Sequence, residues 1–190
     1  MPSTKLSIIY YSQTGTVETM ARRLAATAES LGAEVRLRAV GRDGEDASAT
    51  GEHPAPPTAD DVVWADVVLF GTPTRFGNVA GRLKVFIDSL GAQWAQGQLA
   101  DKVYAGFTST QTVHGGQEST LLNLYTTIHH FGGIIVSPGY TDGSKFVDGN
   151  PYGVGHVTGP ANDAPVDEVA NTALDHLVSR AVTISRRLNA

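Results

Sequence analysis

Hydrophobic residues follow two alternating spacings along the chain, and each spacing predicts one kind of element. Short apolar runs at 6–11, 34–40, 66–71, 102–108 and 133–136 have the length and composition of β-strands. Apolar residues three and four positions apart predict helices at 17–31, 117–131 and 167–188, and a further helix that follows Asn78 as its N-cap. Strands that alternate with helices in this way predict βα units around a mostly parallel sheet.

The polarity of the individual strands predicts their order in the sheet. Residues 8–9 and 67–70 are continuous apolar runs, as expected for strands that helices cover on both faces. Residues 35–38 alternate between apolar and basic side chains, which is typical of an edge strand. An edge second strand fits a flavodoxin-like, doubly wound α/β sheet of five parallel strands in the order 2-1-3-4-5. In that order a ligand lies beyond the carboxyl ends of strands 1, 3 and 4.

The loop after the first strand has the composition of an anion-binding site. It contains Ser12, Gln13, Thr14, Gly15 and Thr16 and leads directly into a predicted helix. The first N–H groups of a helix have no intrahelical partner and lie at the positive end of its dipole, and the hydroxyls add further donors. Because the loop lacks lysine and arginine, a single terminal phosphate suits it better than a triphosphate. The alternative is a hydroxyl-rich turn that only caps its helix.

Two further loops with related chemistry follow strands 3 and 4. The loop at 71–78 combines two threonines, an arginine, a phenylalanine and flanking glycines, and the loop at 108–116 is rich in hydroxyls and glycine. The first of these can lie against a flat ligand, although a proline-nucleated turn before a helix would explain the same residues. None of the three loops contains an acidic residue. A ligand that carries a phosphate and a reducible ring would therefore meet no repulsion there.

Composition excludes several classes of protein. The 190 residues, of which 41% are hydrophobic, suffice for one domain over 1–190. A net charge of −5 without a basic block argues against nucleic-acid binding. No apolar run approaches the ~18 residues that span a bilayer, and the start of the chain lacks a signal-peptide pattern, so we expect a cytoplasmic protein without membrane contact. The absence of cysteine excludes disulfides, and the six histidines have no metal-ligand spacing.

Two stretches depart from the βα pattern. Residues 41–60 are polar and acidic with three prolines, and they predict a loose surface connection without a chemical role. Residues 141–165 hold five glycines and three prolines and are too long for an idle loop inside a compact domain. We expect this second stretch to pack at the mouth of the ligand site or at a subunit contact.

Four motifs of this chain occur together in one known family. They are YYS at 10–12 with Gly15 and ETMA at 18–21, GTPTRFGN at 71–78, FTST at 107–110 with HGGQE at 114–118, and PYG at 151–153. Together they resemble the WrbA family of flavodoxin-like NAD(P)H:quinone oxidoreductases, and GTPTRFGN is the most specific of them. The resemblance implies bound FMN, NADH or NADPH as the reducing substrate, a quinone as its acceptor, and a homotetramer.

The resemblance also assigns roles to single residues. Trp94 matches a tryptophan that covers the flavin ring, although packing in the core or at an interface would also explain it. Thr14 stands where many members have an aromatic residue that touches the nicotinamide, and Phe131 stands where relatives have a histidine lining the flavin pocket. No catalytic side chain is implied, because the chemistry takes place on FMN. The residues implied to bind FMN, besides Phe131, are Ser12, Gln13, Thr14, Gly15, Thr16, Val17, Pro73, Thr74, Arg75, Phe76, Gly77, Asn78, Ser109, Thr110, Gln111, Thr112, Val113, His114, Gly115 and Gly116.

Three functions are compatible with these residues. The favoured one is two-electron reduction of quinones to hydroquinones, in which NAD(P)H passes a hydride to FMN and leaves before the quinone enters. The second is a one-electron carrier of the flavodoxin type, although such carriers usually surround the flavin with acidic residues and these loops have none. The third is a flavin-free regulatory or scaffold protein.

Overall fold

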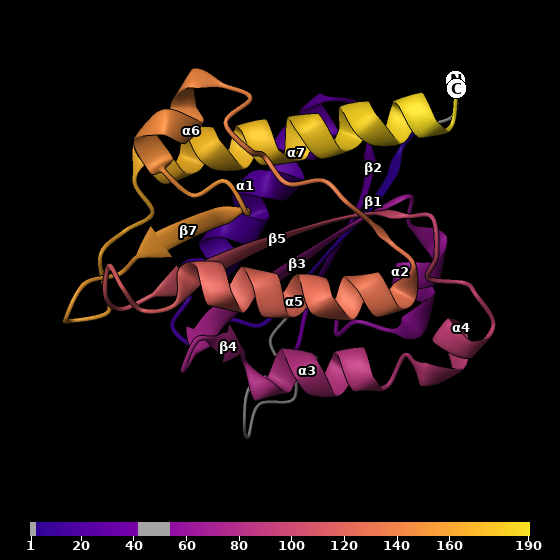
Figure 1. Ribbon diagram of the computed structural model, residues 1–190, viewed down its shortest axis with the longest axis horizontal. Coiled ribbons are helices and arrows are strands. Elements are labelled where there is room, and N and C mark those ends of the chain that lie inside the picture. Colours follow the sequence, from indigo (N-terminus) through magenta and orange to yellow (C-terminus); the bar gives the residue numbers. More distant parts are fainter. Residues whose placement is uncertain (1–2, 42–53) are drawn as a thin grey trace.

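The computed structural model describes residues 3–41 and 54–190, which form an α/β structure around one sheet (Figure 1). Neighbouring strands along the main path of this sheet pair in parallel. The path runs β2 (Glu34–Ala39), β1 (Lys5–Tyr10), β3 (Val67–Arg75), β5 (Val103–Thr110) and β6 (Ile134–Ile135). The predicted flavodoxin-like order is therefore confirmed, with β5 and β6 as the fourth and fifth strands and β2 at the edge.

Helices cover both faces of the sheet and enclose two hydrophobic clusters (Figure 1). One face is covered by α1 (Thr16–Ser30) and α7 (Glu168–Leu188), and the other by α3 (Gly81–Asp88) and α5 (Gln117–Phe131). Successive side chains of a strand point to opposite faces. Ile8 accordingly belongs to the first cluster and Ile9 to the second, and both are fully buried. This arrangement explains why the central strands are continuously apolar.

The fifth position of the sheet is shared by two short strands. After β6 the chain leaves the sheet, forms α6 (Gly143–Asp148) and returns as β7 (Val154–Val157). Both strands pair in parallel with β5, but β6 lies beside Val103 and Tyr104 whereas β7 lies beside 107–110. The stretch 141–165, expected to be a loop, thus contains a helix and a strand. A later part of it, at Asn162, reaches the cavity described below, as expected for the mouth of the site.

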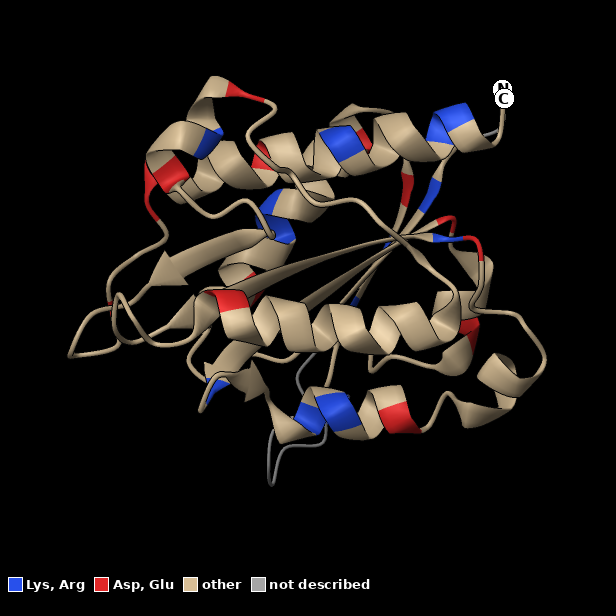
Figure 2. Cartoon of the chain, viewed as in Figure 1, with Lys and Arg blue, Asp and Glu red and all other residues tan. Residues whose placement is uncertain are grey.

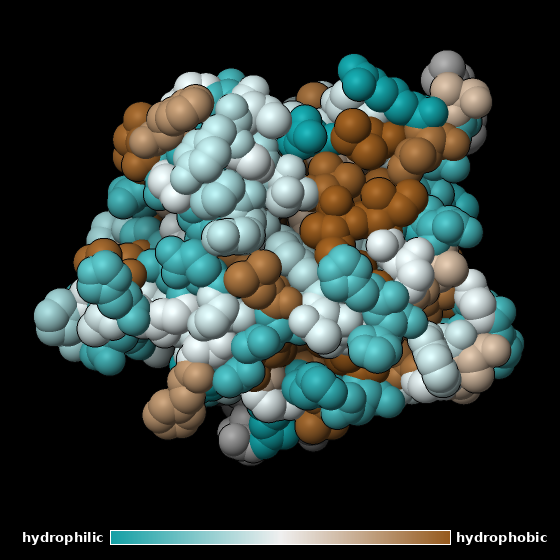
Figure 3. Space-filling view, in the orientation of Figure 1, coloured by the Kyte–Doolittle hydropathy of each residue, from teal (hydrophilic) through white to brown (hydrophobic). Residues whose placement is uncertain are grey.

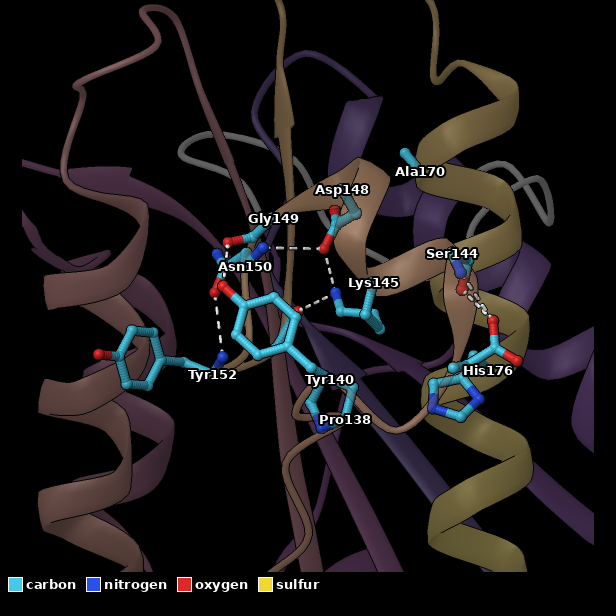
Figure 4. A network of polar contacts seen from close by, with 12 residues as sticks. Pro138, Tyr140, Ser144, Lys145, Asp148, Gly149, Asn150, Tyr152, Ala170 and His176 are labelled. Atoms are coloured by element: carbon cyan, nitrogen blue, oxygen red, sulfur yellow. Dashed lines mark hydrogen bonds and ion pairs between the residues drawn. The ribbon is translucent and has the colours of Figure 1, made fainter.

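A buried ion pair holds the segment that leads into β7 (Figure 4). The ammonium group of Lys145 on α6 pairs with Asp148 and donates to Gly153 O at 2.9 Å, and the lysine side chain is fully buried. Asn150 N donates to Asp148 Oδ2, and Tyr152 N donates to Asn150 Oδ1 at 3.1 Å. Burial lowers the pKa of Lys145 and raises the pKa of Asp148, and each partner's charge opposes the shift of the other. These contacts order a segment that has little core of its own.

The surface beside β6 is hydrophobic. Figure 3 shows apolar side chains between α5 and the C-terminal half of α7. Ile134 and Ile135, the two residues of β6, are half-buried. Among the helices in the described part of the chain, none is long and apolar enough to cross a membrane.

Two expected features at loop boundaries are wrong. Asn78 is not a helix N-cap: it lies in β4 (Asn78–Val79), an antiparallel partner of β3, and Ala80 is the N-cap of α3. The connection at 41–60 is not wholly irregular, since α2 (Ala59–Trp64) begins there behind a capping box formed by Thr58 and Asp61. The part of that expectation that falls on 42–53 lies outside the described residues.

Candidate functional site

Three loops at the carboxyl ends of β1, β3 and β5 surround one cavity of about 320 Å³. This volume lies in the range of small-molecule sites. The strand order reverses between β1 and β3, which is where doubly wound sheets bind their ligands. The lining residues from these loops are Ser12, Gln13, Thr14, Val17, Pro73, Thr74, Arg75, Phe76, Ser109, Thr110, Gln111, Thr112 and Gly115.

The first loop presents the start of α1 to the cavity. Gly15 is the N-cap of α1 and has a φ of 98°, a left-handed conformation that glycine adopts without strain. Its N–H donates to Ser12 Oγ at 3.1 Å, so the serine hydroxyl closes the loop. Thr19 N donates to Gly15 O at 2.9 Å, and the N–H groups of Thr16 and Val17 therefore precede the intrahelical bonds. Because these backbone donors lie at the positive end of a helix, this part of the cavity favours the binding of an anion.

The second loop holds an aromatic ring in solvent at the rim of the cavity. Phe76 and Gly77 form the turn between β3 and β4 with φ values of 52° and 73°. Positive φ at both central residues is characteristic of a type I′ turn, in which asparagine or glycine normally takes the first place. Phenylalanine is strained in this conformation, and its side chain is fully exposed. The backbone thus presents a flat hydrophobic ring beside the cavity.

Close contacts join the second loop to the start of α5. A Cβ on Gly116 would lie 2.8 Å from Gly77 Cα, so the two loops can approach this closely only because Gly116 has no side chain. Asn123 of α5 donates to Gly77 O at 3.1 Å and to Asn78 Oδ1 at 2.8 Å. Gly77, Asn78 and Gly116 therefore support the walls of the cavity from behind. Of the predicted site residues in the three loops, those that lie beside the cavity without lining it are Gly15, Thr16, Gly77, Asn78, Val113, His114 and Gly116.

Trp94 and Phe131 lie at the opposite end of α5 from the cavity. Trp94, in α4 (Gly91–Ala95), donates its Nε1–H to His130 O at 2.7 Å, and Phe131 packs against Tyr104 with ring centroids 6.2 Å apart. The 15 residues of α5 separate this end from Gly116 by about 20 Å. Figure 1 likewise shows α4 and β4 at opposite ends of the molecule. Within one chain, neither Trp94 nor Phe131 lines the cavity, so this chain's own fold does not place them in the roles implied by the resemblance.

Asn162 lines the cavity although no sequence pattern predicted it. It lies in the segment after β7, and its Nδ2 is 3.5 Å from Thr14 Oγ1. Its φ of 58° is left-handed, a region that asparagine tolerates better than most residues. The sequence predicted only that the stretch 141–165 would pack at the mouth of the site or at a subunit contact, and its composition does not show which residue reaches the cavity.

The cavity is uncharged apart from one arginine. Arg75 is the single charged side chain among the lining residues, all of which belong to the described part of the chain. Figure 2 shows that the loops at the carboxyl ends of the strands carry few charged residues, whereas the helices carry both signs. A ligand with negative charge therefore meets no carboxylate in the cavity wall.

Sequence comparison relates the chain to known proteins along most of its length. A model of the NADPH-dependent FMN reductase family matches residues 4–145. The chain is 41% identical to an NAD(P)H dehydrogenase (quinone) of Deinococcus radiodurans, covering 97% of this chain and 96% of that protein. It is also 41% identical to an NAD(P)H dehydrogenase (quinone) of Sinorhizobium fredii, covering 82% of this chain and 83% of that protein.

Solved structures share the fold. A WrbA-like flavodoxin from Agrobacterium tumefaciens matches with a TM-score of 0.70 at 24% identity, covering 97% of this chain and 99% of that one. A flavodoxin from the domain Archaea matches with a TM-score of 0.63 at 14% identity, covering 98% and 100%. Together with the sequence matches, these confirm the resemblance that the motifs indicated. The chain belongs to the NADPH-dependent FMN reductase family and has the flavodoxin-like fold.

Proposed function

We propose that this protein is an FMN-dependent NAD(P)H:quinone oxidoreductase that reduces quinones to hydroquinones. The family model and two relatives, each named an NAD(P)H dehydrogenase (quinone), support this activity. The observation that carries the proposal is the cavity, because it joins all three hydroxyl-rich loops at the carboxyl ends of β1, β3 and β5. The start of α1 supplies an anion-binding end to the same cavity.

The donors and surfaces of the cavity fit FMN. A phosphate requires hydrogen-bond donors without competing carboxylates, and the loop from Ser12 to Val17 supplies N–H groups and hydroxyls at the positive end of α1. A flavin ring requires a flat and partly apolar surface, which Pro73 and the exposed Phe76 offer. The hydroxyls and amide of the loop that begins at Ser109 would hydrogen-bond the polar edge of the ring.

The protein's own part in the reaction is binding, orientation and local electrostatics. When bound, FMN would supply the redox chemistry by taking a hydride from NAD(P)H and passing two electrons to the quinone. Arg75 at the cavity and the absence of acidic lining residues in the described loops would stabilise negative charge that builds up there. The two substrates would occupy the same place in turn, which requires a ping-pong mechanism.

The assembly belongs to the same proposal. The chain would act as one cytoplasmic domain over 1–190, as its length and composition indicate, and would form a homotetramer, as the family resemblance implies. Trp94 and Phe131 lie about 20 Å from the cavity of their own chain along α5, so they can line a flavin pocket only if a second copy brings them to it. Trp94 is 53% exposed and is available for such a contact.

A one-electron carrier is the second candidate, because flavodoxins share this fold. The absence of carboxylates from the described cavity lining favours the enzyme over the carrier. The experiment that separates them begins with the visible absorbance of the purified protein, which reports bound flavin. Anaerobic NADH or NADPH should then bleach the flavin band, and benzoquinone should restore it with one quinone consumed per nicotinamide. A colourless protein that does not take up FMN would contradict both flavin functions.

A further inference from the structure

The segment after β7 crosses from the third loop of the cavity to the first. Thr158 N donates to Thr110 O at 2.8 Å, and Gln111 Nε2 donates to Pro160 O at 2.7 Å. These two bonds fix the beginning of the segment to the third loop. A turn then carries Asn162 to the first loop, where it lines the cavity.

The carboxamide of Asn162 is held in one orientation. Thr158 Oγ1 lies 2.6 Å from Asn162 Oδ1 and 3.1 Å from Thr110 O, and its single proton goes to the shorter contact. A distance of 2.6 Å suits an O–H···O bond and is short for an N–H···O bond. Nδ2 therefore faces the first loop, where it lies 3.5 Å from Thr14 Oγ1, at the limit of a hydrogen bond. An amide nitrogen carries two N–H donors, and this weak contact leaves donor capacity for a ligand in the cavity.

We infer that Asn162 donates a hydrogen bond to the phosphate of the bound flavin nucleotide and completes its anion site. The inference rests on the proposed FMN site. Thr14, which Nδ2 faces, belongs to the same loop as Ser12 and Gly15 at the start of α1. That loop contains no lysine or arginine, so a phosphate bound there depends on neutral donors, and Asn162 adds one from a distant part of the chain.

Two substitutions remove this donor without disturbing the backbone. Asn162→Asp keeps the shape of the side chain, can still accept the bond from Thr158, and tolerates the left-handed φ, but it replaces the N–H donor with a carboxylate. Asn162→Gly removes the side chain and also suits that φ. Asn171→Asp, in α7 and outside the cavity lining, adds the same charge and serves as the control. Circular dichroism during heating would verify that all variants fold.

The measurement is the dissociation constant of each apoprotein for FMN and for riboflavin, which has the same ring system without the phosphate. Asn162→Asp should weaken the binding of FMN by about 10- to 100-fold, which is the loss of affinity expected for one hydrogen bond to a charged group. Asn162→Gly should weaken the binding of FMN by a factor near the lower end of this range. The affinity for riboflavin should stay unchanged in both variants. Asn171→Asp should bind FMN as the wild type does.

Other outcomes would overturn the inference. Unchanged FMN affinity in both Asn162 variants would remove the residue from the phosphate site. Equal losses of affinity for FMN and for riboflavin would show that Asn162 contacts the ring or the ribityl chain. A raised Michaelis constant for NAD(P)H with unchanged FMN affinity would assign it to the reducing substrate. A wild type that binds no FMN would instead contradict the proposed function itself.

Discussion

Trp94 donates its indole N–H to the carbonyl oxygen of His130 at 2.7 Å. That carbonyl is one of the last four of α5, which have no partner within the helix, so Trp94 caps the helix end. The residue nevertheless stays more than half exposed on this chain. The contact explains where the side chain is held, and the exposed part of the residue is available to a second copy.

Trp94→Ala should leave the affinity for FMN unchanged, because Trp94 does not line the cavity of its own chain. If a second copy brings the indole to the cavity, the Michaelis constant for quinone or nicotinamide should rise. Trp94→Phe keeps a ring and loses only the N–H, so it should cost about 1 kcal/mol of stability and affect the kinetics less. Steady-state assays and thermal unfolding test both variants. Lower stability with unchanged Michaelis constants in both would contradict the pocket role.

Ser12→Ala should raise the dissociation constant for FMN by about 10- to 100-fold, because a hydrogen bond to a charged group contributes about 1.5 to 3 kcal/mol. The serine hydroxyl also accepts the bond from Gly15 N that closes the loop. Ser30→Ala, at the other end of α1 and outside the cavity lining, is the matched control. Flavin fluorescence titration measures both. Wild-type affinity in the Ser12 variant, or in a triple variant that also changes Thr14 and Thr16, would remove this loop from the site.

Initial rates measured over a grid of NAD(P)H and quinone concentrations should give parallel lines in double-reciprocal plots. This pattern arises when the first product leaves before the second substrate enters, as a shared position in one cavity requires. Lines that intersect would show that both substrates bind at once. No NAD(P)H oxidation with any of several quinones, in a protein that does bind FMN, would favour the electron carrier instead.

Asp61→Asn should destabilise the protein by about 1 to 3 kcal/mol at neutral pH. Burial opposes ionisation of Asp61, but the N–H and hydroxyl of Thr58 and the guanidinium of Arg38 outweigh it and lower its pKa below the ordinary value of 3.8. Folding thus favours the ionised form of Asp61. The contribution of this carboxylate to the free energy of unfolding is complete at pH values above 3.8, and it disappears as the pH falls through the lower pKa of the folded state.

Urea unfolding of Asp61→Asn and wild type between pH 7 and pH 2 tests this dependence. The difference in unfolding free energy should shrink as the solution becomes more acidic. Asp60→Asn is the control, because the Asp60 side chain is 76% exposed and its pair with Arg36 contributes at most about 1 kcal/mol. A difference that stays constant down to pH 2 would show that Asp61 is not held in its ionised form.

Much of the fold could be predicted because the relevant information is local. Ile8 and Ile9 are both apolar because the two faces of a central strand are buried, and this alone distinguishes β1 from the edge strand β2. The helix predicted at 167–188 is α7, and its first predicted residue, Asp167, is the N-cap whose side chain accepts from the backbone of Ala170. The order of the sheet then brought the three loops together.

Other features depend on partners that no local pattern shows. Asn78 resembles a helix cap in sequence, but pairing with Arg75 of β3 makes it part of a hairpin. The four residues of β7 are a strand only because β5 lies beside them.

The sequence by itself determined the five strands of the main path, the four long helices, their order in the sheet and the three loops of the site, because apolar spacing acts over a few residues. Tertiary structure alone decided that Trp94 lies away from its own cavity and that Asn162 lies within it. Asn162 and Thr14 are 148 positions apart along the chain, and only the folded backbone brings their side chains together.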